Sequence, residues 1–516
     1  MNLSFLKKRK LLLLVLFLSL IGLLLRLLFL YKYSNAFTYD QGRDLLDIRA
    51  MIVLNKLTLI GPTTSLHGVF SGPFWYWMAL PFYLLTNGSP LSTELLMLTL
   101  SLIIPILFFV LISDKKLGLI LSSIYIFAYS FFGTSMTALN TNPMIYSIPL
   151  FLILSAKFFT TSKLKYLFWA FFVMSSTFHF EAIIGVFLIP VFFIAVLIFK
   201  KIKLLISKSI GMIGLLLPLL PQIFFDFRHD FIQSRAIFSL VTGKGDSLTP
   251  AEGDIIFRFQ DRLRIFEDVF KNASMNPFLM IIFIISGIFL LKKLTEIRKS
   301  RKEETYFLQM VFVSLIVIFT GFVVYPYALW PWYLHSIDAL YLTLIGFSIY
   351  FVSTKGRKLA LISSVLLLIF LLFNIKRYDV FPVQPVFTAD AANLRTRIMV
   401  VDSIYESSKG QGFRIFTFAP YVYDYPYQYL IWWRAKTKYN YLPEEYTYLS
   451  NQPPYVAAKI EADKIILSRK STCTYLISEP FESQKQWFID WRGRFPDAQE
   501  SWQIGKTKIE KLCQLK

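Results

Sequence analysis

The feature that most constrains this chain is a series of apolar runs, each long enough to cross a bilayer. A transmembrane helix needs about 20 apolar residues, and the first run, from Leu11 to Leu30, follows four basic residues at 7–10. A signal peptide has an apolar region of only about 7–15 residues, so we interpret this run as an uncleaved first span. Ten more runs follow, at 93–113, 117–133, 143–160, 165–181, 182–199, 204–221, 276–292, 306–325, 335–353 and 357–375. The pattern predicts an α-helical polytopic membrane protein with about 11 transmembrane helices.

The distribution of Lys and Arg predicts which helix ends are cytoplasmic. The chain has 54 Lys+Arg against 33 Asp+Glu, a net charge of +21. Most of this surplus falls in every second loop, beginning with residues 7–10 and continuing with Lys115 and Lys116. Because cytoplasmic loops are enriched in Lys and Arg, we expect a multi-pass protein of the plasma (inner) membrane with a cytoplasmic N-terminus. The positive charge then orients the spans, and it does not indicate a nucleic-acid partner.

One further apolar segment, at 70–85, does not cross the membrane in this scheme. It contains Gly72, Pro73 and Pro81 and is rich in Trp and Tyr, which is typical of a segment in the membrane interface. If it crossed, Lys115 and Lys116 would lie outside and every later loop would be inverted. We therefore expect interfacial helices within the first outer loop, residues 31–92.

The odd number of spans places residues 376–516 outside the membrane, after a transmembrane module at 1–375. Ordinary turn residues and short strand-like runs, such as 413–418 and 474–477, predict a small soluble α/β domain there. Both cysteines of the chain, Cys473 and Cys513, fall in it, and in an oxidising exterior they either pair or remain buried thiols. Two Cys and four His exclude a thiolate zinc cluster and leave little for a His-built metal site.

Polar residues that suit catalysis or binding gather at the outer ends of the predicted spans. Carboxylates can serve as a base or as metal ligands, whereas Arg and His donate charge-assisted hydrogen bonds to phosphate. Ionisable groups near membrane depth are costly and mark functional sites, although ion pairs, helix caps and aromatic anchors are the ordinary structural alternatives. The candidates are Asp40, Arg43, Asp44 and Tyr76 in the first outer loop, Asn140 and Asn142, His179 and Glu181, Arg228 and His229 at the start of a large outer loop at 222–275, and Tyr333 and His335.

At these residues the sequence resembles the GT-C superfamily of membrane glycosyltransferases, in the branch of the protein O-mannosyltransferases and the lipid A aminoarabinose transferase. The matching features are Tyr39-Asp40, Gly61-Pro62, Gly72-Pro73-Phe74-Trp75-Tyr76, Asn140-Thr141-Asn142-Pro143, His179, Phe225-Asp226-Phe227-Arg228-His229 and Tyr333-Leu334-His335, together with the C-terminal domain. The resemblance implies a polyprenyl-phosphate sugar donor, an acceptor hydroxyl on a lipid, protein or glycan, and inversion at the anomeric carbon. It also implies that Asp40 acts as general base or holds a divalent metal ion.

This chain lacks one acidic residue that many members of the superfamily have. Many relatives carry a second acid after the third span, where this chain has Asn140 and Asn142. This departure favours Asp40 as general base with the metal ion optional, and it makes Glu181 the candidate second acid.

Two alternative functions stay open from the sequence. A transporter or flippase of lipid-linked saccharides would have charged residues along a path across the bilayer, an internal repeat and broken helices. A ligase or polymerase of the O-antigen type would use a large outer loop with Arg and His, such as 222–275. The acidic first loop and the folded C-terminal domain favour the transferase.

Overall fold

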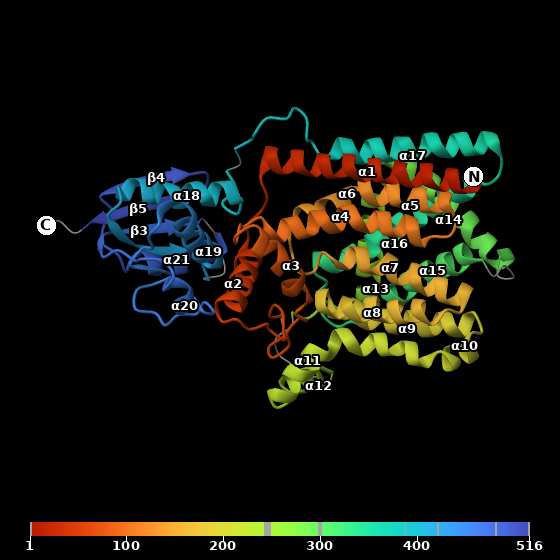
Figure 1. Ribbon diagram of the computed structural model, residues 1–516, viewed down its shortest axis with the longest axis horizontal. Coiled ribbons are helices and arrows are strands. Elements are labelled where there is room, and N and C mark those ends of the chain that lie inside the picture. Colours follow the sequence, from red (N-terminus) through yellow and green to blue (C-terminus); the bar gives the residue numbers. More distant parts are fainter. Residues whose placement is uncertain are drawn as a thin grey trace.

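The computed structural model describes residues 3–64, 66–241, 249–297, 302–387, 389–419, 423–479 and 482–513. Long helices form an elongated bundle, and a sheet-containing domain packs against one end of it (Figure 1). We call this end of the bundle the domain end. The N-terminus lies at the opposite, far end.

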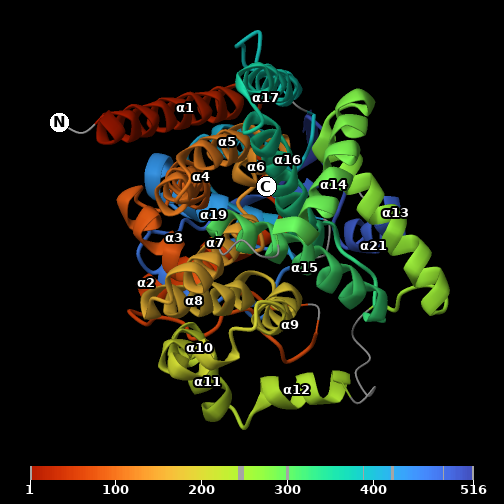
Figure 2. The same cartoon turned by 90° about the vertical axis from the view of Figure 1, so that its right-hand side faces the viewer.

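Every predicted span is helical in the structure. The helices are α1 (Leu3–Tyr33), α4 (Ser92–Leu111), α5 (Lys115–Phe127) with α6 (Tyr129–Met136), α7 (Met144–Thr161), α8 (Leu164–Phe180), α9 (Ala182–Ile198), η1 (Ser209–Leu215) with α11 (Leu216–Arg228), α14 (Pro277–Ile297), α15 (Glu303–Val324), α16 (His335–Ser353) and α17 (Arg357–Arg377), with the short α10 (Ile202–Ser207) before η1. Viewed along the bundle, α7 lies in the middle, and α1 and α17 lie at the periphery (Figure 2). This order matches their burial, because α7 is mostly enclosed by other helices whereas α1 and α17 expose most of their apolar surface.

Length and composition qualify seven of the described helices as membrane spans, and nine if each of two bent helix pairs counts as one. The bent pairs are α5 with α6, at 51°, and α13 (Ile255–Ser274) with α14, at 111°. The difference from the eleven predicted spans comes from α8 and α9, which have 17 residues each. Both are shorter than the roughly 20 residues that cross a bilayer without tilt or thinning.

The predicted outer loops are largely helical. The first contains α2 (Tyr39–Val53) and α3 (Phe74–Leu85), which lie between the bundle and the C-terminal domain (Figure 1). With 12 residues, α3 is too short to cross a bilayer, which agrees with its predicted interfacial place. The large outer loop at 222–275 contains α12 (Ile232–Val241) and α13. Residues 242–248 of this predicted loop lie outside the described residues.

The C-terminal domain is built on a five-stranded mixed sheet with strand order β2-β1-β3-β5-β4. Its elements are α18 (Leu394–Ser408), β1 (Gly412–Phe418), α19 (Tyr425–Arg434), η3 (Ala435–Tyr439), β2 (Glu445–Thr447), α20 (Lys459–Asp463), β3 (Ser471–Ser478), α21 (Lys485–Arg492), β4 (Glu500–Ile504) and β5 (Thr507–Cys513). Strand β1 is parallel to β2 and β3, whereas β5 is antiparallel to β3 and β4. Cys473 and Cys513 face each other across β3 and β5 and form a disulfide, so of the two alternatives left open the structure shows the paired one.

Backbone hydrogen bonds tie this domain to the first loop of the bundle. Phe37 N donates to Ala392 O at 2.7 Å, and Leu394 N donates to Asn35 O at 2.9 Å. The buried Arg397 donates to Phe37 O and forms an ion pair with Glu479 at 2.8 Å. The segment that enters α2 is therefore held by the C-terminal domain as well as by α1.

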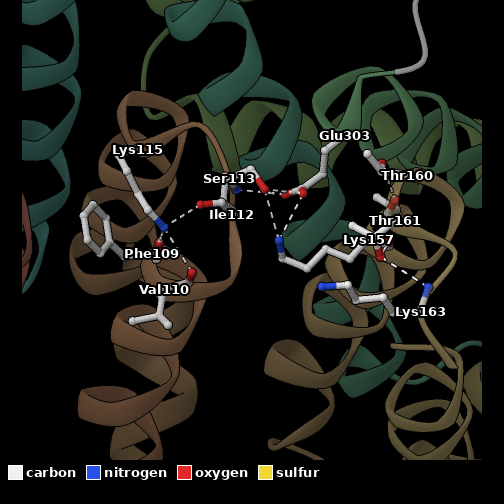
Figure 3. A network of polar contacts seen from close by, with 11 residues as sticks. Phe109, Val110, Ile112, Ser113, Lys115, Lys157, Thr160, Thr161, Lys163 and Glu303 are labelled. Carbon is white, nitrogen blue, oxygen red and sulfur yellow. Dashed lines mark hydrogen bonds and ion pairs between the residues drawn. The ribbon is translucent and has the colours of Figure 1, made fainter. Parts of the chain in front are cut away.

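A network of polar contacts lies at the far end of the bundle (Figure 3). Glu303, at the start of α15, accepts hydrogen bonds from Ser113 N at 2.9 Å and from Lys157 Nζ at 3.0 Å. Lys115 Nζ donates to three backbone carbonyls at the end of α4, at 2.7–3.0 Å. The network links α4, α7 and α15. The Lys- and Arg-rich stretch at 292–302 begins within the last turns of α14, and its residues 298–301 lie outside the described residues.

Candidate functional site

A cavity of about 490 Å³ opens at the domain end of the bundle, where α2, α8, α9, α11 and α12 converge. We call it the site cavity. Five of the residues singled out in the sequence line it: Asp40, Arg43, Asn140, Glu181 and Tyr333. Its apolar wall includes Phe178, Leu219, Ile223 and Trp332. One cavity thus joins acidic side chains and a cation from separate segments to an apolar surface.

The first turn of α2 places Asp40 at the cavity. Thr38 precedes the helix with extended backbone, and its N–H donates to Gln41 Oε1 at 2.6 Å, which is the capping-box pattern. Asp40 lies in the first turn, where the helix dipole favours a negative charge. Its side chain is 44% exposed, so the carboxylate is accessible from the cavity.

Arg43 lies between two carboxylates. Its guanidinium is 2.9 Å from Asp40 and 2.8 Å from Asp44, and its side chain is only 13% exposed. Asp44 is buried and is fixed in turn by Trp75 Nε1 at 2.8 Å and by the Tyr76 hydroxyl at 3.3 Å. Burial raises the pKa of the Asp44 carboxyl from its ordinary 3.8 to about 6, although the adjacent Arg43 charge lowers it. Asp44 and Tyr76 therefore lie behind the cavity wall and orient Arg43.

Glu181 reaches the cavity from the opposite side. It separates α8 from α9 with an extended backbone, φ −151° and ψ 105°, and its N–H donates to Thr177 O at 2.8 Å. This short break between two helices turns the side chain toward the cavity, which Tyr333 and Asn140 also line. The acidic side chains of Asp40 and Glu181 and the cation of Arg43 thus line one cavity.

Two predicted site residues are buried next to the cavity and do not line it. Asn142 Nδ2 donates to Thr134 O at 2.9 Å and also to Thr137 O, so its amide holds the turn before α7. His179 is fully buried and stacks on Phe74 with ring centroids 4.0 Å apart. A Cβ on Gly72 would lie 1.8 Å from the His179 ring, which explains the glycine in that segment.

The structure does not bring Arg228, His229 or His335 to the site cavity. Arg228 and His229 are exposed at the end of α11, and the residue that lines the cavity there is Asp226. A helix turns about 100° per residue, so Arg228 points away when Asp226 points inward. His335 lines a separate cavity of about 310 Å³ with Asp338 and lies 3.9 Å from its carboxylate. Of the cationic candidates from the sequence, Arg43 lines this cavity and Arg228 and His229 do not.

Sequence reasoning missed Asp226, Gln222 and Gln233, which also line the cavity. Asp226 accepts hydrogen bonds from Gln233 N at 2.7 Å and from the Ser234 hydroxyl at 2.5 Å, so it fixes the start of α12. The seven-residue spacing between Asp226 and Gln233 does not by itself predict this turn. The only sequence signal for Asp226 was its position on one face of helix α11.

The donor set does not fit the divalent metal ion that the resemblance implies. Within the described ranges, no three or more His, Cys, Asp and Glu side chains are grouped so that they could hold one ion. Asp40, the implied ligand, is paired with Arg43 instead. We therefore derive no step through a metal ion.

No family model matches this sequence, and no curated protein matches it either. Solved structures are similar over nearly the whole chain. ArnT from Cupriavidus metallidurans bound to undecaprenyl phosphate has a TM-score of 0.61 at 9% identity, covering 97% of each chain. The apo state of the same protein has a TM-score of 0.58 at 10% identity, covering 96% of this chain and 97% of that one.

An oligosaccharyltransferase from Archaeoglobus fulgidus, in complex with Zn and sulfate, has a TM-score of 0.43 at 13% identity and covers 92% of this chain and 70% of that one. The predicted helical membrane fold with a small C-terminal sheet domain is confirmed. The chain has the fold of ArnT from Cupriavidus metallidurans.

Proposed function

We propose that the protein is a membrane glycosyltransferase that moves a sugar from a polyprenyl-phosphate donor to an acceptor hydroxyl at the site cavity. The observation that carries this proposal is the grouping of Asp40, Arg43 and Glu181 around one cavity with an apolar wall. The ArnT-like fold supports it, because that ArnT structure contains undecaprenyl phosphate. In the proposed orientation the cavity opens on the outer face of the membrane.

Arg43 is the proposed phosphate-binding residue. A guanidinium donates charge-assisted hydrogen bonds that suit phosphate oxygens. Asp44 holds Nη2 of this guanidinium at 2.8 Å. The other terminal nitrogen, Nη1, lies 2.9 Å from Asp40, and in our proposal it also donates to the phosphate. The apolar wall formed by Phe178, Leu219 and Ile223 would receive the first part of the prenyl chain.

Asp40 is the proposed general base. The acceptor oxygen forms a bond to the anomeric carbon while the bond from that carbon to the phosphate oxygen breaks. The acceptor proton passes to the Asp40 carboxylate, and the bonding electrons leave with the polyprenyl phosphate. Attack from the side opposite the leaving group inverts the anomeric centre. General base catalysis of this kind contributes about 10²–10⁴ in rate.

The remaining groups stabilise charge and position the sugar. Negative charge grows on the phosphate as it leaves, and a donor placed for that charge contributes about 10²–10³ in rate. Arg43 is that donor in our proposal. Glu181 and Asn140, from the other side of the cavity, would accept and donate hydrogen bonds to sugar hydroxyls.

The test is transfer of radiolabelled sugar from a panel of undecaprenyl-phosphate sugars to lipid, protein and glycan acceptors by the reconstituted protein. We expect Asp40→Asn to lower the rate at least about 100-fold without changing thermal stability. Asp230→Asn is the matched control, because Asp230 is exposed and does not line the site cavity. Wild-type activity in Asp40→Asn would show that Asp40 is not the general base.

The whole proposal fails if the wild-type protein binds no polyprenyl-phosphate sugar of the panel. Movement of intact donor across proteoliposomes without transfer to any acceptor would indicate a flippase instead.

A further inference from the structure

A second cavity lies in the C-terminal domain, away from the groups of the proposed reaction. It has a volume of about 660 Å³ and lies between the edge strand β2 and helix α20. We call it the domain cavity. This volume is within the range of about 300–1,000 Å³ that is typical of small-molecule sites.

Two ion pairs neutralise most of the charges at the domain cavity. Lys459 Nζ lies 2.7 Å from Asp463, which also accepts a hydrogen bond from the Tyr446 hydroxyl. On the rim, Glu444 pairs with Arg414 at 3.1 Å, and Glu445 accepts from the backbone N–H of Asn451 at 3.0 Å. Glu445 and Lys464, which also lines the cavity, add one charge of each sign, so that with the two ion pairs the charges sum to zero. This balance favours a neutral, hydroxyl-rich molecule over an anion.

Tyr455 and Gln428 give the cavity an aromatic side and a polar floor. Tyr455 is half-buried and lies in a cluster with Tyr423 and Tyr425, at centroid distances of 5.4 and 5.9 Å. Gln428 is 1% exposed, and its Nε2 donates to Tyr446 O at 2.8 Å, while its Oε1 has no hydrogen-bond partner among the described residues. A buried acceptor without a partner is unusual, and a ligand hydroxyl would be the donor that it lacks.

A third cavity lies between the site cavity and the domain cavity. This bridging cavity, about 350 Å³, shares Arg43, Thr63 and Phe70 with the site cavity and reaches Ala457 at its other end. The preceding residue, Val456, lines the domain cavity. Helix α2 packs directly against α20, so the bridging cavity ends next to the domain cavity.

We propose that the domain cavity binds a saccharide unit of an extended glycan acceptor, whose reacting hydroxyl lies in the site cavity. This inference deepens the proposed function and rests on it for the identity of the reaction, although binding itself does not depend on transfer. A short acceptor would occupy the site cavity alone. A long acceptor would gain affinity from the second contact, because both contacts are made by one molecule.

Binding of neutral tetrasaccharides to the full-length protein in detergent tests the proposal directly. Isothermal titration with maltotetraose, cellotetraose and chitotetraose is expected to show binding of at least one. Tyr455→Ala is expected to weaken it at least about tenfold, equivalent to about 1.4 kcal/mol. Trp487→Ala is the matched control, because Trp487 is 57% exposed on the same domain and does not line the cavity.

A second variant protects the test against misfolding of the first. Ile460 lines the cavity from α20 and is 55% exposed, so Ile460→Arg obstructs the cavity without removing a buried contact. Both variants should lower affinity at an unchanged unfolding temperature. The proposal is overturned if no tetrasaccharide binds the wild-type protein, or if both variants bind as the wild type does.

Two further measurements complete the test. One identifies the source of the glycan, and the other distinguishes failure of this proposal from failure of the proposed function. A tetrasaccharide linked to undecaprenyl pyrophosphate that binds more tightly than the free one identifies a lipid-linked acceptor, whereas equal affinities identify a free glycan; both retain the site. Asp40→Asn should bind the tetrasaccharide as the wild type does. If the wild type binds it but transfers no sugar, the proposed function fails while the domain cavity keeps its ligand.

Discussion

The position of the Arg43 guanidinium depends on the protonation state of Asp44. The pKa of this buried carboxyl is raised to about 6, and its negative charge holds the guanidinium at 2.8 Å. Below pH 6 Asp44 takes up a proton and the charge pair is lost. We expect the affinity for a polyprenyl-phosphate sugar to fall as the pH drops through 6, measured by titration between pH 5 and 8. Asp44→Asn should have weak affinity at every pH and no inflection near 6.

The stability of the protein should respond to Asp44 in the opposite direction. Its pKa in the folded state, about 6, is higher than the ordinary 3.8 of an unfolded chain, so the folded state binds this proton more tightly. The contribution of Asp44 to the free energy of unfolding is therefore fully present below pH 3.8 and is lost as the pH rises through 6. Thermal unfolding of wild type and Asp44→Asn between pH 4 and 7 measures it. A wild-type free energy of unfolding that rises relative to that of Asp44→Asn as the pH increases from 4 to 7 would contradict the sign.

At the scale of single residues, the sequence allowed prediction of which charges lie near the cavity better than which way they point. Asp40, Arg43 and Glu181 were candidates because they stand beside apolar runs, and all three line the cavity. Arg228 also adjoins an apolar run, yet α11 turns it away and presents Asp226 instead. Helical phase near a helix end is set by tertiary packing, which local sequence does not specify.

Helix α2 carries Asp40 and Arg43 and lies against α19 of the C-terminal domain. A Cβ on Gly42 would lie 2.5 Å from Pro426 N, so the backbones meet there without room for a side chain. We expect Gly42→Ala to displace α2 and to lower the transfer rate by about 100-fold, because catalysis is sensitive to shifts of about 1 Å. Rate and unfolding temperature of the purified variant are the measurements.

The control for this substitution is Gly133→Ala. A Cβ on Gly133, in α6, would meet nothing within 4 Å. It should keep both the transfer rate and the unfolding temperature. If Gly42→Ala also kept both, the close approach of α2 and α19 would have no part in positioning the site.

The ion pair at the far end of the bundle joins α7 to α15. Lys157 and Glu303 are each 7% exposed and 3.0 Å apart (Figure 3). Lys157→Met leaves the Glu303 charge buried without its partner, which costs about 3–5 kcal/mol. We expect the free energy of unfolding in detergent to fall by that amount, and Lys163→Met, on an exposed side chain, to leave it unchanged.

A double variant tests the cause of that loss. Replacing Glu303 together with Lys157 by Met removes both charges, and it should restore most of the stability because no unpaired charge remains buried. A double variant as unstable as Lys157→Met would assign the loss to packing of the lysine side chain instead.

For the molecule as a whole, apolar periodicity was sufficient to predict the bundle but not its contacts. Each predicted span is a helix because runs of Leu, Ile, Phe and Val leave the backbone no other way to satisfy its hydrogen bonds in lipid. The sheet domain was predicted from short runs such as 413–418, which is β1. Its docking onto the first loop depends on the contact between Arg397 and Phe37, which are 360 residues apart in the chain and have no local signal.

The orientation of the molecule follows from its charge and is the last prediction. The loops at the far end carry the Lys-rich segments, including Lys163, and the positive-inside rule places them in the cytoplasm. The C-terminal domain at the opposite end (Figure 1) would then lie outside, where an oxidising compartment maintains the Cys473–Cys513 disulfide. Because both native cysteines are paired, one introduced cysteine reports its own side. In right-side-out vesicles, a membrane-impermeant maleimide should label Trp487→Cys at once and Lys163→Cys only after permeabilisation. The reverse labelling would invert the topology and place the proposed site cavity on the cytoplasmic face.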